Sequence, residues 1–197
     1  MLTIYTDGSC AKGRSGWGYV ILRDGEKVKC GAGQKSGATN QCMELTAAIE
    51  ACHEADLIRE KGEPIIVYSD SAYLINCVND RWYLNWETNG WVNSKKEPVA
   101  NKELWEELIP YFRCVTFSFE KVKGHAGHTY NELADRLARG LESPARDTDL
   151  TTDQKNDTII IELSELLIKY KMNLTSTQET ISTIMRIMAR EGAKISG

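Results

Sequence analysis

The 197-residue sequence lacks long apolar runs and has no pair of cysteines at C-x-x-C spacing. Its apolar stretches are a few residues long, far short of the roughly 20 residues that a membrane-spanning helix needs. The six cysteines are scattered, so we expect reduced, structural thiols and no zinc site. The N-terminus lacks the basic and then apolar succession of a secretory signal. These absences predict a cytoplasmic protein with no membrane partner.

Positive charge is not in excess either. The chain has 24 basic and 28 acidic residues, for a net charge of −4. This balance excludes a protein that holds nucleic acid by bulk positive charge alone. With 42% hydrophobic residues and only 4 prolines, the composition is that of a globular protein. The length allows one ordinary domain with room for an appendage.

The pattern of strands and helices predicts an α/β fold. A continuous apolar run such as 65–68 is typical of a buried strand, and Asp24-Gly25 is typical of a hairpin turn. We expect a mixed five-stranded sheet, with three antiparallel strands followed by parallel ones, flanked by helices. The expected strands are 2–6, 16–22, 27–31, 65–68 and 115–122, and the expected helices are 41–61, 72–79, 101–109 and 130–141. The aromatic segment 82–91 has poor periodicity and is given no helix or strand.

The chain divides by composition into three parts. Residues 1–141 carry the expected strands and helices and the candidate chemistry. Residues 142–157 are polar, which predicts an exposed linker. Residues 158–197 contain apolar residues at the spacing of two short amphipathic helices. We expect these helices to form a small C-terminal appendage. Because such helices are not stable alone, we expect them to pack on each other, on the main domain, or on a second chain or a protein partner.

Four acidic residues fall at informative positions. Asp7 and Asp70 each follow an apolar strand, and parallel neighbouring strands bring both side chains to one edge of the sheet. Glu44 lies on the small-residue face of its helix, which should pack against the sheet, and Asp135 lies in the last helix. Each acid taken singly is more simply a cap or a turn residue.

Taken together, the four acids predict a metal site. Carboxylates that converge without basic partners repel each other unless cations neutralise them. Oxygen ligands favour hard ions such as Mg²⁺, for which Mn²⁺ can substitute. Two such ions about 3.5–4 Å apart are typical of in-line phosphoryl displacement, which points to a nuclease.

The motifs around these acids resemble the type 1 ribonuclease H family in its bacterial form, over residues 1–140. The series is Thr6-Asp7-Gly8-Ser9, Asn40-Gln41-Cys42-Met43-Glu44-Leu45, Ser69-Asp70-Ser71, Val122-Lys123-Gly124-His125-Ala126-Gly127-His128 and Asn131-Glu132-Leu133-Ala134-Asp135. The resemblance implies a ribonuclease H-like fold and an enzyme that cuts the RNA strand of an RNA–DNA hybrid.

The resemblance also implies the metal ligands. Asp7, Glu44, Asp70 and Asp135 would form the Asp-Glu-Asp-Asp set for two Mg²⁺ ions. Asp7 would bridge both ions, Asp70 and Asp135 would hold the ion that activates water, and Glu44 would hold the ion at the departing 3′ oxygen. The products would carry 5′-phosphate and 3′-hydroxyl ends.

Two further residues near the acids are candidates. His125 has a side chain suited to proton transfer or product release, and the alternative is an ordinary surface histidine. Glu132 is a candidate for a supporting role beside the ions.

Substrate contacts follow from the same resemblance. Asn40 and Gln41 lie at a helix start, where side chains and free N–H groups can reach a minor groove. The DNA strand would be held by a phosphate pocket and an aromatic ridge. Thr39 and Asn85 match the pocket, while Trp82 and Trp86 match the ridge, although core packing is an alternative for each tryptophan.

The handle segment, residues 82–99, departs from the better-known bacterial pattern. Glu87-Thr88-Asn89 follows Trp86 where lysine and arginine are usual. We therefore expect modest affinity for the hybrid and a shallow salt dependence. Two other readings stay open, a non-catalytic hybrid-binding module and another nuclease of the ribonuclease H-like superfamily.

Overall fold

The computed structural model describes residues 1–11, 13–123 and 128–144. The chain divides into two compact units, Met1–Ala145 and Arg146–Gly197. The predicted appendage, residues 158–197, and nearly all of the predicted linker lie outside the described residues. Within the described residues, none of the helices is long and apolar enough to cross a lipid bilayer.

The described part of the chain forms one sheet with helices on both faces. The strands are β1 (Leu2–Ala11), β2 (Arg14–Arg23), β3 (Glu26–Gln34), β4 (Ile65–Ser69) and β5 (Phe117–Lys121). The helices are α1 (Asn40–Ile58), α2 (Ala72–Asn79), α3 (Trp82–Asn89), α4 (Lys102–Arg113) and α5 (Thr129–Ala138).

The sheet has the strand order β3-β2-β1-β4-β5. β1, β2 and β3 pair antiparallel, whereas β4 pairs parallel with both β1 and β5. The predicted mixed five-stranded sheet is confirmed. The hairpin at Asp24 and Gly25 is also confirmed, because both residues have positive φ, as a two-residue hairpin turn requires.

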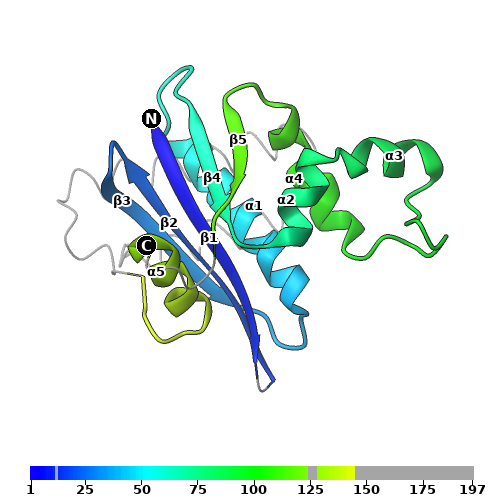
Figure 1. The fold of residues 1–197 in the computed structure, drawn as a ribbon. Coiled ribbons are helices and arrows are strands. Elements are labelled where there is room, and N and C mark those ends of the chain that lie inside the picture. The colour runs from blue at the N-terminus through cyan, green and yellow to red at the C-terminus, as the bar shows by residue number, and fades with distance from the viewer. Residues whose placement is uncertain (12, 124–127, 145–197) are drawn as a thin grey trace, which may run out of the picture. The chain divides into compact units, whose positions relative to one another are not determined.

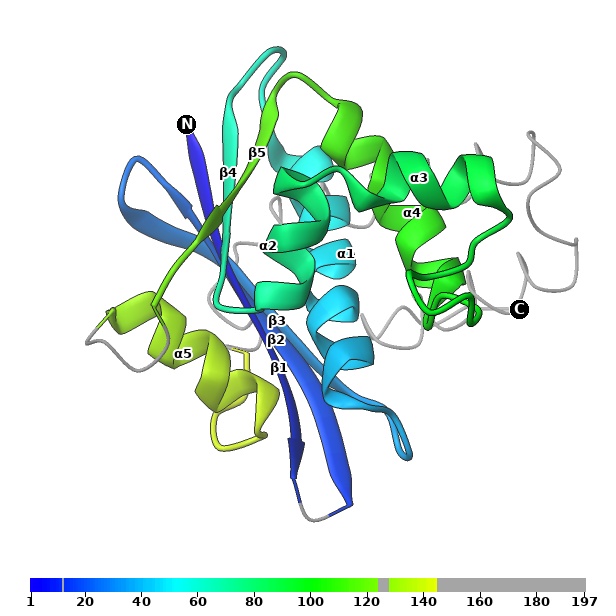
Figure 2. The ribbon, with the colours of Figure 1, turned by 45° about the vertical axis from the view of Figure 1, so that its right-hand side comes forward.

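Helices cover the two faces of the sheet unequally. α1 packs against β1 and β2 on one face, and α5 packs against the same two strands on the other face (Figure 1). α2 and α4 contact β5 on the α1 side, and α3 extends away from the sheet (Figure 2). Ile21 of β2 belongs to the core under α1, and its neighbour Val20 to the core under α5, as strand alternation requires.

The prediction that the first strand ends before Asp7-Gly8-Ser9 is wrong. β1 continues to Ala11, because β2 is long enough to pair with it along its whole length. Only the parallel partner stops there, since the last β1–β4 pair is Thr6 with Ser69. Asp7 is therefore an interior residue of β1 and also the first residue beyond the parallel pairing.

The aromatic segment contains a helix that the sequence did not predict. α3 occupies residues 82–89. Its buried Trp86 packs against Trp91 and Trp105, which lie outside the helix. Its apolar positions contact a local aromatic cluster rather than the sheet, so they carry no clean helical period. α4 also runs past the predicted end at 109 and continues to Arg113, with Pro110 inside the helix.

Candidate metal centre

Three carboxylates meet at the edge where the parallel pairing ends. Asp70 directly follows β4, and Asp7 occupies the equivalent place on β1. Glu44, in the first turns of α1, joins them. One oxygen of each side chain lies within 4.8 Å of the other two. Asp7 and Glu44 are buried and Asp70 is half-buried.

Close backbone contact places Glu44 beside β1. A Cβ atom at Gly8 would lie 2.2 Å from the Glu44 nitrogen, so only glycine allows α1 to lie this near the strand. The small residues of α1, among them Ala48 and Ala51, are fully buried on the same face. Gly8 was predicted from the sequence only as part of a turn after the first strand.

The fourth acid, Asp135, belongs to α5, on the face of the sheet opposite α1. Asp135 is half-buried in α5, outside the 4.8 Å group, and its carboxyl shares a hydrogen bond with Asp7. Arg139 Nη1 contacts Asp135 Oδ2 at 3.2 Å, one helical turn away. α5 can lie this close to β2 because Gly18 has no side chain. A Cβ atom there would lie 2.6 Å from the Ala134 carbonyl oxygen. Alternating glycines in a strand sequence, here Gly16 and Gly18, were the available signal for such an approach.

Burial and the charges of neighbouring acids raise the pKa values of Asp7 and Glu44. Burial, followed by the charges of Asp70 and Asp135, raises the pKa of Asp7 to about 7. Burial, followed by the charges of Asp7 and Asp70, raises the pKa of Glu44 to about 9. A hydrogen bond from the Gly8 backbone lowers both values, but by less than burial raises them.

The two carboxylate oxygens of Glu44 differ in their hydrogen bonding. Asn40 Nδ2 donates to Glu44 Oε1 at 3.3 Å. Within the described part of the chain, the buried Glu44 Oε2 has no hydrogen-bond partner. A buried carboxylate oxygen without a donor is costly, and a cation can satisfy it. The donor set consists of carboxylate oxygens, which fits a hard divalent ion.

The predicted substrate residues occupy two places. Thr39 is the N-cap of α1, and its side chain accepts a hydrogen bond from the Cys42 nitrogen at 3.2 Å. Asn40 and Gln41 follow it at the exposed start of the helix. Glu132 lies half-buried in the first turn of α5. His125 is outside the described residues.

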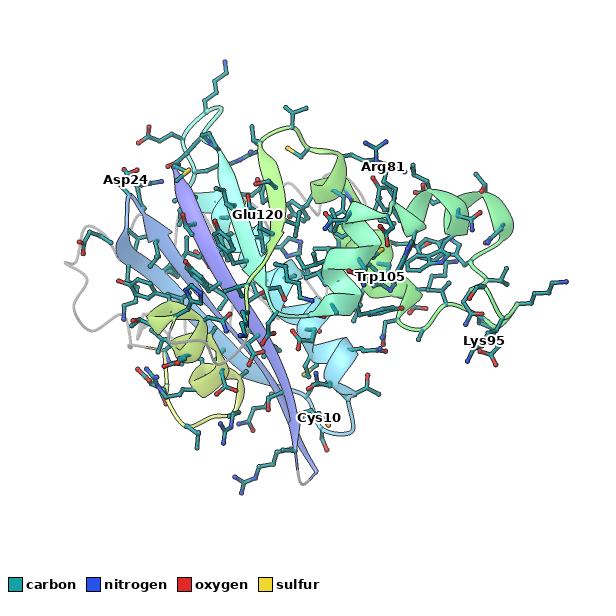
Figure 3. The ribbon with its side chains drawn as sticks, in the orientation of Figure 1. Cys10, Asp24, Arg81, Lys95, Trp105 and Glu120 are labelled. Atoms are coloured by element: carbon teal, nitrogen blue, oxygen red, sulfur yellow. The ribbon has the colours of Figure 1, made fainter. Side chains whose placement is uncertain are left out.

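The other predicted substrate residues line a cavity of about 770 Å³ next to the start of α1. Trp82 and Asn85 of α3 offer exposed or half-exposed surface, whereas Trp86 is buried in the aromatic cluster. The lining carries charges of both signs, with Arg81 opposed by Asp80 and Glu97. Arg81 and Lys95 mark this outlying part of the chain in Figure 3.

Comparison with known proteins gives consistent matches over the described unit. The family model for RNase H matches residues 1–142. A relative named ribonuclease H from Syntrophomonas wolfei is 51% identical over 140 residues, covering 70% of this chain and 93% of the relative. A ribonuclease H from Moorella thermoacetica is 42% identical over 149 residues, covering 74% of this chain and 93% of the relative.

Solved structures give the same result. The PFV RNase H domain in solution matches with a TM-score of 0.59 and 28% identity, covering 71% of this chain and 92% of that one. A foamy viral protease-reverse transcriptase in complex with RNA/DNA hybrid matches with a TM-score of 0.60 and 25% identity. That match covers 71% of this chain and 19% of the viral chain.

Proposed function

Because this chain belongs to the RNase H family and is a ribonuclease H enzyme, we propose that it hydrolyses the RNA strand of RNA–DNA hybrids with two divalent cations. The products would carry 5′-phosphate and 3′-hydroxyl ends. The observation that carries the proposal is the group formed by Asp7, Glu44 and Asp70, whose oxygens lie within 4.8 Å of one another. Three separate elements supply these residues, which argues against a chance surface cluster.

The four acids would hold the cations. Asp7 lies close to Glu44 and Asp70 and also interacts with Asp135, which supports a shared ligand role for its carboxylate. The orphaned Glu44 Oε2 supports a ligand role for Glu44. Bound Mg²⁺ or Mn²⁺ would neutralise phosphate charge and make water a better nucleophile. Asp135, which shares a hydrogen bond with Asp7 and also pairs through Oδ2 with Arg139, would complete the set.

The other residues would orient the duplex and move protons. Thr39, Asn40 and Gln41 start α1 at the surface, and free N–H groups at a helix start suit contacts with a polyanion. Trp82, Trp86 and Asn85 line the neighbouring cavity, where a DNA strand would lie. His125 would transfer a proton or assist product release, and Glu132 would support the ions from α5.

Hybrid binding has support from a structural neighbour. The foamy viral protein that shares this fold was solved with an RNA/DNA hybrid bound. In a hybrid, the RNA strand is recognised by its 2′-hydroxyl groups, which duplex DNA lacks. Cytoplasmic location and a partner for residues 158–197 remain predictions from the sequence.

A cleavage panel tests the proposal. Matched RNA–DNA, RNA–RNA and DNA–DNA duplexes are incubated with the full chain and Mg²⁺, and the product ends are mapped. We expect cleavage of the RNA strand of the hybrid alone. Hybrid binding without cleavage would favour the non-catalytic module, and cleavage of the other duplexes would favour a different nuclease of the superfamily.

A further inference from the structure

A buried serine closes the turn that leads into α1. Ser15, at the start of β2, is 5% exposed, and its hydroxyl donates to the Ala38 carbonyl oxygen at 2.8 Å. Its own carbonyl oxygen accepts a hydrogen bond from the Lys35 nitrogen at 3.0 Å. One residue therefore holds both ends of the turn 35–38.

The neighbouring strand reinforces this contact. Cys10 of β1 pairs with Ser15 across the sheet, and its thiol donates to the same Ala38 oxygen at 3.3 Å. Figure 3 labels Cys10 where β1 passes near the chain that enters α1. Gly37 in the turn has a φ of +72°, a conformation that favours glycine. The strand that carries Asp7 is thus tied directly to the approach to α1.

The turn delivers the residues that would meet the hybrid. Ala38 is followed by Thr39, the N-cap, and then by the exposed Asn40 and Gln41. A shift of the Ala38 peptide would move this helix start. Glu44 is held separately, because α1 is buried from Cys42 to Leu45 and contacts Gly8 closely. Loosening the turn should therefore disturb residues 39–41 more than the metal ligands.

We propose that Ser15 is a positioning residue for substrate recognition, with Cys10 in a supporting role. Ser15 holds the turn 35–38 and so fixes the start of α1 against the sheet. The inference rests on the proposed function, since it takes Thr39, Asn40 and Gln41 to be contacts for the hybrid.

The test compares Ser15→Ala and Ser15→Thr in the full chain. Loss of one neutral hydrogen bond should raise KM for the hybrid about threefold to tenfold and leave kcat within about twofold. Ser15→Thr keeps the hydroxyl and should restore KM. Ser118→Ala is the matched control, because Ser118 on β5 makes a longer bond of 3.5 Å, to Ile65, and does not contact the turn.

Amide hydrogen exchange gives a readout that does not depend on activity. The Cys42 and Met43 amides donate to Thr39, so Ser15→Ala should make both exchange faster, and Ser15→Thr should not. If Ser15→Ala melts below the assay temperature, Cys10→Ala carries the test, with a smaller change in the same direction.

The outcomes separate the two proposals. An unchanged KM, a loss confined to kcat, or unchanged exchange at residues 39–43 would each overturn the role of Ser15. Absence of hybrid cleavage by the parent chain would overturn the proposed function instead, while the exchange measurement would still judge whether Ser15 holds the turn.

Discussion

Gly18 of β2 lies directly opposite Asp7 of β1, and a Cβ atom at Gly18 would meet the Ala134 carbonyl oxygen of α5 at 2.6 Å. The missing side chain lets α5 pack close to the sheet beside Asp7. Gly8 does the same for α1 on the other face, with a distance of 2.2 Å to the Glu44 nitrogen. Two glycines thus bring the acids of two helices to one strand.

We expect Gly18→Ala to weaken both the fold and the activity. The nearest atoms are the Ala134 oxygen, the Ala138 nitrogen and the Leu137 Cβ, none of which can rotate away, so α5 must shift, at a cost of roughly 1–3 kcal/mol. Denaturant unfolding and a cleavage assay below the melting temperature measure the two effects. Ser118→Ala, on the exposed face of β5, should change neither. Wild-type stability and activity in Gly18→Ala would refute the close approach.

The metal-free protein should lose stability as the pH rises. The pKa values of Asp7 and Glu44 are raised to about 7 and about 9 in the folded state, above about 4 in an unfolded chain. Their contribution is therefore fully present below about pH 4 and is lost as the pH rises through both folded values. We expect the free energy of unfolding to fall between pH 5 and pH 9, because the unfolded chain loses these two protons while the folded protein still holds them.

Denaturant titrations in chelator at pH 5, 7 and 9 measure this decline. Glu44→Gln should reduce it, because the amide carries no charge. Mg²⁺ should restore more stability at pH 8 than at pH 5, since carboxylates bind the ion when deprotonated. The pKa of Glu63, held at about 2 by the Glu60 backbone and by the N-terminal amine, changes stability only at lower pH. A flat or rising profile would contradict the electrostatic account.

Asp70→Asn should abolish cleavage and leave the fold nearly intact. The substitution keeps the shape of the side chain and removes the charge that would help to hold a cation. Cleavage rate and circular dichroism are measured together. Asp24→Asn is a matched control on an exposed hairpin turn, where asparagine tolerates the positive φ, and it should cleave normally. An active Asp70→Asn enzyme would exclude Asp70 from the metal centre.

His125→Ala should slow turnover by roughly 10²-fold, the size typical of one general acid–base group. Single-turnover and steady-state rates on a hybrid distinguish proton transfer from product release, because only the first alters the single-turnover rate. His53→Ala, on α1, provides a control with the same change in side chain. A parental rate in His125→Ala would mean that this histidine takes no part in the reaction.

Cleavage should depend only weakly on salt. Residues 1–140 carry 17 basic against 19 acidic side chains. Glu87 of the handle segment also forms an ion pair with Arg113 of α4, so this arginine is less available for phosphate contacts. Few phosphates are then neutralised, so the slope of log affinity against log salt should be small. A steep slope, measured by hybrid binding between roughly 50 and 200 mM salt, would show many ionic contacts.

The sequence predicted most of the sheet because its signals are local. The apolar run at 65–68, the Asp24-Gly25 turn and the small-residue face of 41–61 each report on nearby residues alone. The motif series also pointed to Asp7, Glu44 and Asp70, which the structure brings together. By contrast, α3 was missed because its tryptophans pack on one another in a local cluster, which leaves no regular period to read.

Amino-acid order alone was therefore enough to give the succession of strands and helices except α3, the family resemblance and the candidate acids. Only the tertiary structure decided that β1 runs through Asp7 to Ala11, that Gly8 and Gly18 admit two helices to that strand, and that Ser15 holds the approach to α1. The physical reason is that each of these features depends on pairing or packing with another element, and no local pattern records how closely two backbones approach.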